Sequence, residues 1–315
     1  MPILRLNAVD DRPVPPGGEA FGPALRCALS ASDPDIPALV MIHGYKYTPF
    51  DPARCPHGSI FAANGVGKPR RCASWPRAMG FTPERTGNGL CIAFGWDAAG
   101  TIWQAARSAE SASRALSHLV SHLAAYRGRP VHVLAHSLGA RVALGGLKGA
   151  DGGAVGRMVL LHGAELRSRA LNALDHRAGT TTEIVNVTTR ENDLFDMLFR
   201  ASVAPHRPLD PALSAGLGTR RTNWLDMRID DPATRAALKD FGFDIPAPVG
   251  RVCHWSAYMR AGMFDLHRAL LCAREPLPLA MLARVLPDGA RRGLLERTFA
   301  REAAICLPRG AQASS

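Results

Sequence analysis

A serine with small neighbours stands near the middle of this chain, between two kinds of segment. The residues Ala135-His136-Ser137-Leu138-Gly139 follow the apolar run 131–134 and precede a helix-like stretch, 140–148. A serine on a sharp turn between a buried strand and a helix exposes its hydroxyl above the edge of the sheet. The N–H groups that begin the helix can stabilise negative charge on an attacked carbonyl oxygen. The segment therefore predicts covalent acyl chemistry, with Ser137 as the nucleophile.

A serine hydroxyl also needs a base to take its proton, and histidine is the usual one. Of the eleven histidines, only His254 and His267 follow the last predicted strand. His267 lies inside a helical pattern, whereas His254 lies in the loop-like segment 250–255. The side chain of His136 is expected to point away from the neighbouring hydroxyl. Position also argues against a role as the base for His118 and His122, which lie in a predicted helix, and for His132 and His162, which lie in predicted strands.

The base must in turn be oriented, and a carboxylate commonly does this. Three candidates follow the predicted strand 183–188, namely Glu191, Asp193 and Asp196. A side chain just past the carboxyl end of a parallel strand can reach the edge of the sheet where Ser137 is expected. An acidic residue at a helix start is also a common N-terminal cap, so position alone leaves the three open.

The elements that must position these residues alternate along the chain. Short apolar runs alternate with helical patterns, which is typical of a parallel sheet with crossover helices. Two long connections, 45–89 and 201–221, are loop-like, and the first is expected to hold a short helix near Trp75. The predicted strands are 2–8, 24–30, 38–43, 90–96, 131–136, 158–162, 183–188 and 224–229, and the predicted helices include 105–123, 167–174 and 257–271.

Taken together, these segments resemble the α/β-hydrolase superfamily, and in particular its lipase- or esterase-like serine hydrolases. The resemblance spans about 38–271 and depends on the turn at Ser137, the His43-Gly44 pair after a strand, and the positions of Asp193 and His254. It implies an α/β-hydrolase fold, with a mostly parallel central sheet and helices on both faces. Ala135 departs from the usual G-x-S-x-G pattern at its first glycine.

The resemblance also implies catalytic roles. In this superfamily the acid follows the serine along the chain and the histidine comes last, which assigns Ser137, Asp193 and His254 as the catalytic residues. Asp193 is preferred because its segment resembles the acid turn of lipase-like hydrolases, with Glu191 and Asp196 as alternatives.

The same resemblance implies a site for the attacked carbonyl. The N–H groups of Leu138 and Tyr45 would form the oxyanion hole, with Gly44 allowing the backbone to turn. Trp96 and Trp255 are candidates to line an apolar acyl pocket, and packing in the core or at its rim is the alternative.

The function so implied is cleavage of a carboxylic ester through an acyl-enzyme, on a small-molecule acyl substrate and without a cofactor. Two alternatives use the same fold. One is a non-catalytic binding module. The other is an acyltransferase with the same three residues, since transfer differs from hydrolysis in whether the site excludes water.

Length and composition are consistent with one large domain. The chain has 315 residues, 47% of them hydrophobic, which is enough for a sizeable core. We expect the hydrolase domain over 1–273, with 45–89 as a loop insertion, and a helical extension over 274–315. The net charge of +11 comes from scattered arginines rather than a basic cluster, so no nucleic-acid partner is expected.

Metal binding and membrane insertion are not expected either. Seven cysteines form no CxxC pair, and Cys55, His57 and Cys72 lack a fourth ligand at zinc-site spacing. No apolar stretch approaches the ~20 residues of a membrane span. The first residues, 1–14, do not resemble a signal peptide, so a cytoplasmic location is the expectation.

Overall fold

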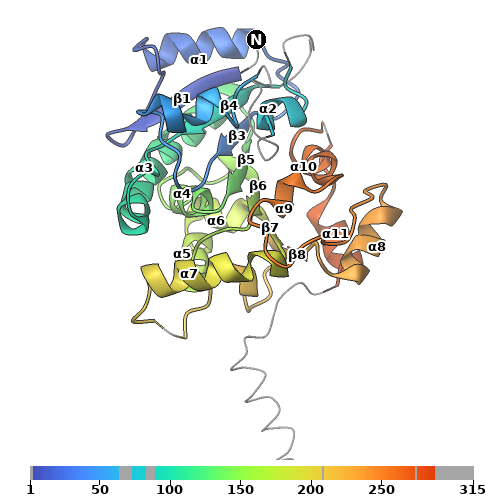
Figure 1. Ribbon diagram of the computed structural model, residues 1–315. Helices are drawn as coiled ribbons and strands as arrows, with labels where there is room; N and C mark the ends of the chain where they lie inside the picture. The colour runs from blue at the N-terminus through green and yellow to red at the C-terminus, as the bar shows by residue number, and fades with distance from the viewer. Residues whose placement is uncertain (1–2, 64–72, 83–88, 208, 274, 288–315) are drawn as a thin grey trace, which may run out of the picture.

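A computed structural model of the protein describes residues 3–63, 73–82, 89–207, 209–273 and 275–287, with an eight-stranded sheet at its centre (Figure 1). The strand order is β2-β1-β4-β3-β5-β6-β7-β8. All neighbouring strands are parallel except β1 and β2, so the predicted mostly parallel sheet is confirmed. The strands are β1 (Ile3–Val9), β2 (Arg12–Val14), β3 (Leu39–Ile42), β4 (Cys91–Gly95), β5 (Val131–His136), β6 (Val155–Leu161), β7 (Glu183–Thr188) and β8 (Trp224–Arg228).

Helices cover both faces of this sheet, and each face has its own apolar core. Along β3, Val40 and Ile42 point into one core while Leu39 and Met41 point into the other, as the two-residue period of a strand requires. The first core is covered by α1 (Phe21–Ser30), α3 (Ile102–Arg127), α4 (Gly139–Gly146), α5 (Arg167–Leu174), α6 (Arg177–Thr181) and α7 (Asp193–Val203). The second is covered by α2 (Trp75–Ala78), α8 (Pro232–Asp240), α9 (Ser256–Met259), α10 (Met263–Leu271) and α11 (Leu279–Val285).

The long crossover helix α3 is fixed at both ends by its sequence. The side chains of Thr101 and Gln104 form a reciprocal capping box at its start, and Gly128 ends it at φ 62°. The apolar positions that predicted this helix are all buried, and they face the sheet and α4. Because α4 follows Ser137 directly, α3 supports the helix that begins at the predicted nucleophile. The buried positions are Ala105, Ala109, Ala112, Leu116, Leu119 and Leu123.

One predicted strand is wrong. Residues 24–30 belong to α1 rather than to a strand. Its buried side chains are Leu25, Ala28 and Leu29, a spacing of three and four residues that fits one face of a helix. The turn-rich segment 10–18 before it also contains β2, which pairs antiparallel with β1 at the edge of the sheet.

The two long connections contain short helices. The first holds 3₁₀ helices at Pro52–Arg54 and Pro56–Gly58 and, as predicted, the short helix α2 at Trp75. Residues 64–72 and 83–88 lie outside the described part, and Cys72 with them. The second connection begins with the end of α7 and contains a 3₁₀ helix at Leu213–Ala215.

Past residue 273, α11 packs into the second core through Leu279 and Leu282. The rest of the predicted helical extension, 288–315, lies outside the described residues. Among the helices that are described, none has the length and apolar character needed to cross a membrane.

Candidate functional site

Ser137 lies on a strained turn between β5 and α4. Its φ is 53°, in the left-handed region that residues other than glycine rarely adopt, and its side chain is nearly buried. The turn is held by backbone hydrogen bonds. The Ser137 N–H donates to Leu161 O at 2.9 Å, and Ser137 O accepts from the N–H groups of Ala140 and Ala164. The strand, the sharp turn and the helix are those of a nucleophile elbow.

Small residues around this turn let the backbone segments approach closely. A Cβ on Gly139 would lie 2.6 Å from His43 O, and one on Gly44 would lie 2.8 Å from the Cβ of Ser137. Neither position therefore has room for a side chain. Ala135, which replaces the first glycine of the usual motif, is fully buried in the first core, where its methyl group is accommodated.

His254 is the histidine that the fold brings to Ser137. Its Nε2 lies 2.9 Å from Ser137 Oγ, although the two residues are 117 positions apart in the sequence. The segment carrying His254 immediately precedes Trp255 and α9, and the N–H of Cys253 ties it to Glu191 O at 2.9 Å. The predicted serine and the predicted base are thus within hydrogen-bonding distance.

The other ring nitrogen of His254 meets Asn192, not the predicted Asp193. Nδ1 of His254 lies 2.6 Å from Asn192 Oδ1. An amide oxygen only accepts hydrogen bonds, so Nδ1 carries the proton and Nε2 is left to accept from the Ser137 hydroxyl. Asn192 ends a 3₁₀ helix, Arg190–Asn192, and is buried, whereas Asp193 begins α7 with an exposed side chain.

The two other acidic candidates lie elsewhere around the same turn. Glu191 is buried in an ion pair with Arg260 and accepts a hydrogen bond from the Thr189 hydroxyl at 3.2 Å. Asp196 is buried one helical turn further along α7. Asn192 was not among the predicted residues because a carboxylate is the usual partner of the base, and because residue types do not reveal the backbone geometry that turns residue 192 inward.

The surroundings of His254 favour its neutral form. Burial, followed by the nearby His136 and His162, lowers the pKa of His254 from 6.5 to about 2. The ring of Phe195 from α7 lies 4.6 Å away, centroid to centroid. A neutral imidazole can accept the proton of a serine hydroxyl over a wide pH range.

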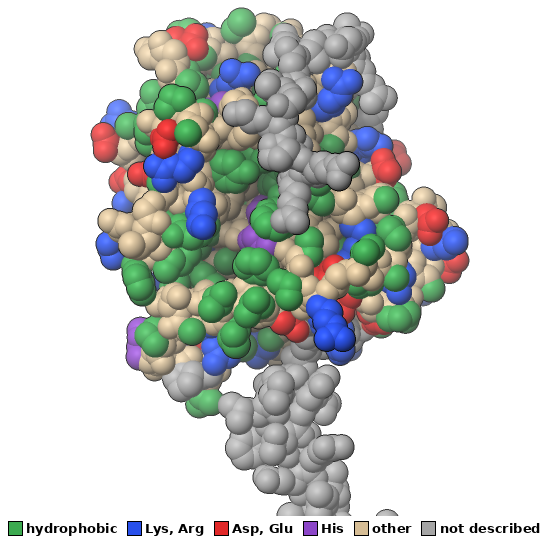
Figure 2. Space-filling model, in the orientation of Figure 1, with side chains coloured by type: hydrophobic (Ala, Val, Ile, Leu, Met, Phe, Trp, Pro, Cys, Tyr) green, Lys and Arg blue, Asp and Glu red, His purple; other side chains and the backbone are tan. Residues whose placement is uncertain are grey.

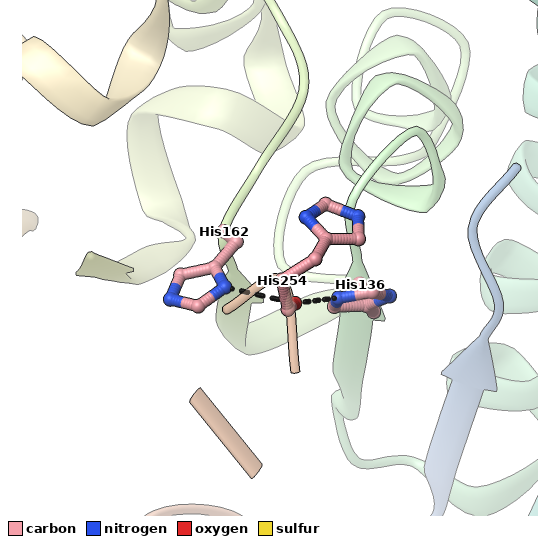
Figure 3. Close-up of side chains that lie close together, drawn as sticks. All are labelled: His136, His162 and His254. Carbon is pink, nitrogen blue, oxygen red and sulfur yellow. Dashed lines mark hydrogen bonds between the residues drawn. The ribbon is translucent and has the colours of Figure 1, made fainter. Parts of the chain in front are cut away.

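Two further histidines, not predicted to have a role, contact the backbone of His254. Nε2 of His136 and Nδ1 of His162 each lie 3.0 Å from His254 O (Figure 3). His136 ends β5, directly before Ser137, and His162 follows β6 with φ 47°. In Figure 3 the two rings approach this carbonyl oxygen from opposite sides, while the ring of His254 extends away from it.

These three histidines are also close enough to be considered as metal ligands. Within the described residues, they form the group whose ligand atoms come near one another, all within 4.8 Å. Both ring nitrogens of His254 already face Ser137 and Asn192, and a nitrogen of each partner faces the His254 carbonyl. Cys55 and His57, considered for zinc in the sequence, are not part of this group, and His57 Nε2 instead lies 2.7 Å from Asn7 Oδ1.

The loop after β3 lies beside the serine turn, as expected for a carbonyl-binding site. The N–H of Lys46, at φ 75°, donates to Ala98 O at 2.9 Å, and the Tyr45 hydroxyl donates to Gly100 O at 2.7 Å. Among the described residues, the backbone N–H groups of Tyr45 and Leu138 have no hydrogen-bond partner.

Trp96 does not line an open pocket, in contrast to the prediction. It is fully buried, its indole N–H donates to His43 O at 3.0 Å, and its ring stacks on that of His43. Trp96 lies at the end of β4, next to β3, so its side chain packs behind the loop that carries Gly44 and supports it.

Trp255 remains beside the base. It is half-buried, and its ring lies 6.1 Å from that of His254. Figure 2 shows histidine side chains in a hollow of this face, with hydrophobic side chains gathered around them. On α7, Leu194, Met197 and Leu198 are about half exposed although they are apolar. The rings of Phe195 and Trp255 thus place aromatic side chains beside His254.

Comparison with known proteins agrees with the fold. Residues 25–151 match the model of a family described as an alpha/beta hydrolase of unknown function, DUF900. The matched range includes β3, β5, the turn at Ser137 and α4, and it ends before Asn192 and His254. None of the curated proteins matches the chain. The eight-stranded, mostly parallel sheet and this partial family match together support an α/β-hydrolase fold.

Proposed function

We propose that the protein is a serine hydrolase that cleaves carboxylic esters through an acyl-enzyme. Ser137 would be the nucleophile and His254 the general base, with Asn192 orienting His254. The observation that carries the proposal is the 2.9 Å distance between Ser137 Oγ and His254 Nε2, at a serine with left-handed backbone. A hydroxyl and a neutral imidazole at this distance are the minimum that nucleophilic serine chemistry requires.

The reaction follows from these positions. Oγ of Ser137 attacks the ester carbonyl carbon while Nε2 of His254 takes the hydroxyl proton. The tetrahedral oxyanion would accept hydrogen bonds from the N–H groups of Tyr45 and Leu138, which have no other partner among the described residues. His254 then gives the proton to the leaving alcohol, and the acyl group stays on Ser137. In the second half, water attacks the acyl carbon, His254 takes its proton, and Ser137 is released with the acid.

Asn192 provides orientation without a charge. Its Oδ1 holds the Nδ1–H of His254, which fixes the tautomer with a free electron pair on Nε2. A carboxylate would in addition stabilise the imidazolium that forms during attack. A slower reaction than that of a Ser–His–Asp enzyme is therefore the expectation for this site.

The apolar surroundings indicate the kind of acyl group. The rings of Phe195 and Trp255 lie beside the proposed base, His254, at centroid distances of 4.6 and 6.1 Å. Apolar surface next to the reacting carbonyl favours an ester with a hydrocarbon acyl chain over a short or charged one.

A fluorophosphonate probe, which reacts with activated serines, tests the proposal. The wild type is compared with Ser137→Ala and His254→Ala, and with Ser168→Ala as a control at an exposed serine on α5. We expect labelling and ester hydrolysis in the wild type and the control, neither in Ser137→Ala, and a loss of both in His254→Ala. A folded wild type without labelling, or unchanged labelling of Ser137→Ala, would contradict the proposal.

The same assay separates hydrolysis from acyl transfer. A small alcohol is added during ester cleavage, and the products are measured. Free acid as the main product supports a hydrolase, whereas a new ester that forms in preference to the acid in dilute alcohol would assign an acyltransferase with the same residues.

A further inference from the structure

The backbone carbonyl of His254 accepts two hydrogen bonds from buried imidazoles. His136 donates from Nε2 and His162 from Nδ1, each over 3.0 Å, and both side chains are more than nine-tenths buried. A carbonyl oxygen has two lone pairs, so both donors can be satisfied at once.

We propose that His136 and His162 act as a histidine clamp, which holds the backbone of the base at hydrogen-bonding distance from the nucleophile. The inference rests on the proposed function, in which His254 is the base. The two histidines would be positioning residues, because they contact the main chain of His254 and not the reacting atoms.

The position of His254 in the chain explains why it needs such support. It lies in a segment without helix or strand before α9, tied by the Cys253–Glu191 backbone hydrogen bond. A loop residue is held less firmly than one in a strand, and a displacement of about 1 Å at a reacting group can cost about a hundredfold in rate. Additional bonds to a rigid element would keep Nε2 in place.

The clamp connects this loop to the same strand ends that hold the serine. His136 directly precedes Ser137 on β5, and the N–H of Ser137 bonds to Leu161 O, directly before His162. The nucleophile and both clamp residues are therefore fixed to one another through β5 and β6. Any movement of these strand ends would shift the serine and the base together.

The backbone of His162 gives an independent indication. Its φ of 47° is a left-handed conformation that costs a non-glycine residue on the order of 1 kcal/mol. Its N–H still bonds to Val187 O, so the turn is an ordered part of the fold. The hydrogen bond to His254 gives this strained conformation a role.

A metal site made of the same three histidines is the alternative, and the hydrogen bonds disfavour it. A ring nitrogen that faces a carbonyl oxygen must be protonated and has no lone pair for a metal. The nitrogens that His136 and His162 direct at the His254 oxygen are therefore donors, not ligands.

The clamp predicts opposite tautomers for the two histidines, which ¹⁵N–¹H correlation spectra of histidine-labelled full-length protein can detect. His136 would carry its proton on Nε2 and His162 on Nδ1. Burial lowers the pKa of His136 to about 4, so its ring is neutral at pH 7. Resonances are assigned by comparison with His136→Gln and His162→Asn. Any other combination of tautomers, or a zinc-induced shift of all three histidines, would overturn the clamp.

Substitutions that keep or remove the hydrogen-bond donor at 136 and 162 test whether the clamp affects the reaction rate. The amide of glutamine can replace Nε2 of His136, and that of asparagine can replace Nδ1 of His162, whereas leucine at either position has no donor. We expect His136→Leu and His162→Leu to lower kcat about tenfold or more with KM within about twofold, and His136→Gln and His162→Asn to recover most of the loss. Leucine variants with wild-type kcat, or with the same kcat as the amide variants, would overturn the proposal.

His132→Leu is the matched control. His132 is also a buried histidine on β5, and its Nδ1 lies 2.9 Å from Leu271 O, away from the site. We expect this variant to lose thermal stability but to keep kcat. If the leucine variants at 136 and 162 fail to fold, the kcat of the two amide variants and the tautomers of His136 and His162 in the wild type still test the clamp.

The test also separates failure of the clamp from failure of the proposed function. If the wild type proves inactive, the ¹⁵N shifts of His254 replace kcat as the readout. They should keep their wild-type values in the two amide variants and move in the two leucine variants. Unchanged shifts in the leucine variants would show that the clamp does not position His254.

Discussion

At the scale of single residues, the candidate site combines a strained serine with a neutral histidine, the proposed base. The pKa of His254 is lowered to about 2, and its Nδ1 faces the amide oxygen of Asn192 rather than a carboxylate. The sequence alone does not distinguish the roles of Asn192 and Asp193, because both are short polar residues at a helix start. Only one of them points inward, so the two positions can be separated by substitution.

Asn192→Leu and Asp193→Asn form a pair of neighbouring substitutions that decides which side chain orients the base. We expect Asn192→Leu to lower kcat/KM by about tenfold or more, because His254 loses the acceptor of its Nδ1–H. Asp193→Asn should stay within about twofold of the wild type, because its side chain is exposed. The measurement is kcat/KM for an ester, and a larger effect at residue 193 than at 192 would restore the carboxylate as the orienting group.

Asn192→Asp should shift the pH dependence. The base works only when neutral, so activity is lost as pH falls through the pKa of His254. In the wild type this pKa is about 2, and kcat/KM should stay level well below pH 6.5. A carboxylate beside the ring favours the charged imidazolium and raises the pKa, so the variant should lose activity at a higher pH.

The profile is measured on ester cleavage over the pH range in which circular dichroism shows a folded protein. An acid limb at the same pH in both proteins would show that Asn192 does not act on His254.

At the scale of elements, the site depends on how closely β3, β5 and α4 approach one another. Gly139 begins α4 against the carbonyl of His43, and Gly44 lies against Ser137. Behind them, the buried Trp96 stacks on His43 and accounts for the position of the loop. The elbow is therefore a packing arrangement of three elements and not a property of the five-residue motif alone.

Gly139→Ala tests this packing. Alanine is the better helix former, so local propensity alone would predict a small gain in stability. The added Cβ would instead lie 2.6 Å from His43 O, a backbone atom that cannot move independently. We expect a loss of about 1–3 kcal/mol in the free energy of unfolding, together with most of the activity.

Gly58→Ala is the control for this change, because a Cβ there meets no atom within 4 Å and the residue is exposed. Urea denaturation measures both variants. A Gly139→Ala variant as stable as the wild type would mean that the elbow has more room than the structure gives it.

At the scale of the whole molecule, burial holds six histidines of the described residues in the neutral form. Burial is the main cause that lowers the pKa in each case. The values are about 3 for His43, about 4 for His57, His132, His136 and His267, and about 2 for His254. Glu165 has the opposite effect on the pH dependence of stability. Burial raises its pKa, so its protonation stabilises the folded state as pH falls.

These histidines predict that the protein loses stability on mild acidification. In the unfolded chain they titrate near pH 6.5, while in the folded chain they stay neutral to about pH 4 or below. Between these values the unfolded state binds more protons, so stability falls as pH falls, by up to about 1.4 kcal/mol per pH unit for each histidine. The urea midpoint should therefore be clearly lower at pH 5 than at pH 7. Equal midpoints at the two pH values would show that the histidines are not buried as described.

The sequence by itself determined the fold class, and it predicted two site residues that the structure brings within hydrogen-bonding distance. Apolar runs alternating with helical patterns specify a parallel sheet, because burial on both faces requires continuous apolar strands. Ser137 and His254 could be proposed from the sequence because a strand–turn–helix motif and a loop after the last strand are local features. The strand predicted at 24–30 failed where a short apolar run also fits one face of a helix.

The tertiary structure decided which side chains point into the candidate site and which point away from it. It turned Asn192 inward and Asp193 outward, placed Trp96 in the core, and brought His136 and His162 to the carbonyl of His254. Such contacts join segments that are up to 118 residues apart. They depend on backbone angles and on packing between elements, which residue type and spacing along the chain do not contain.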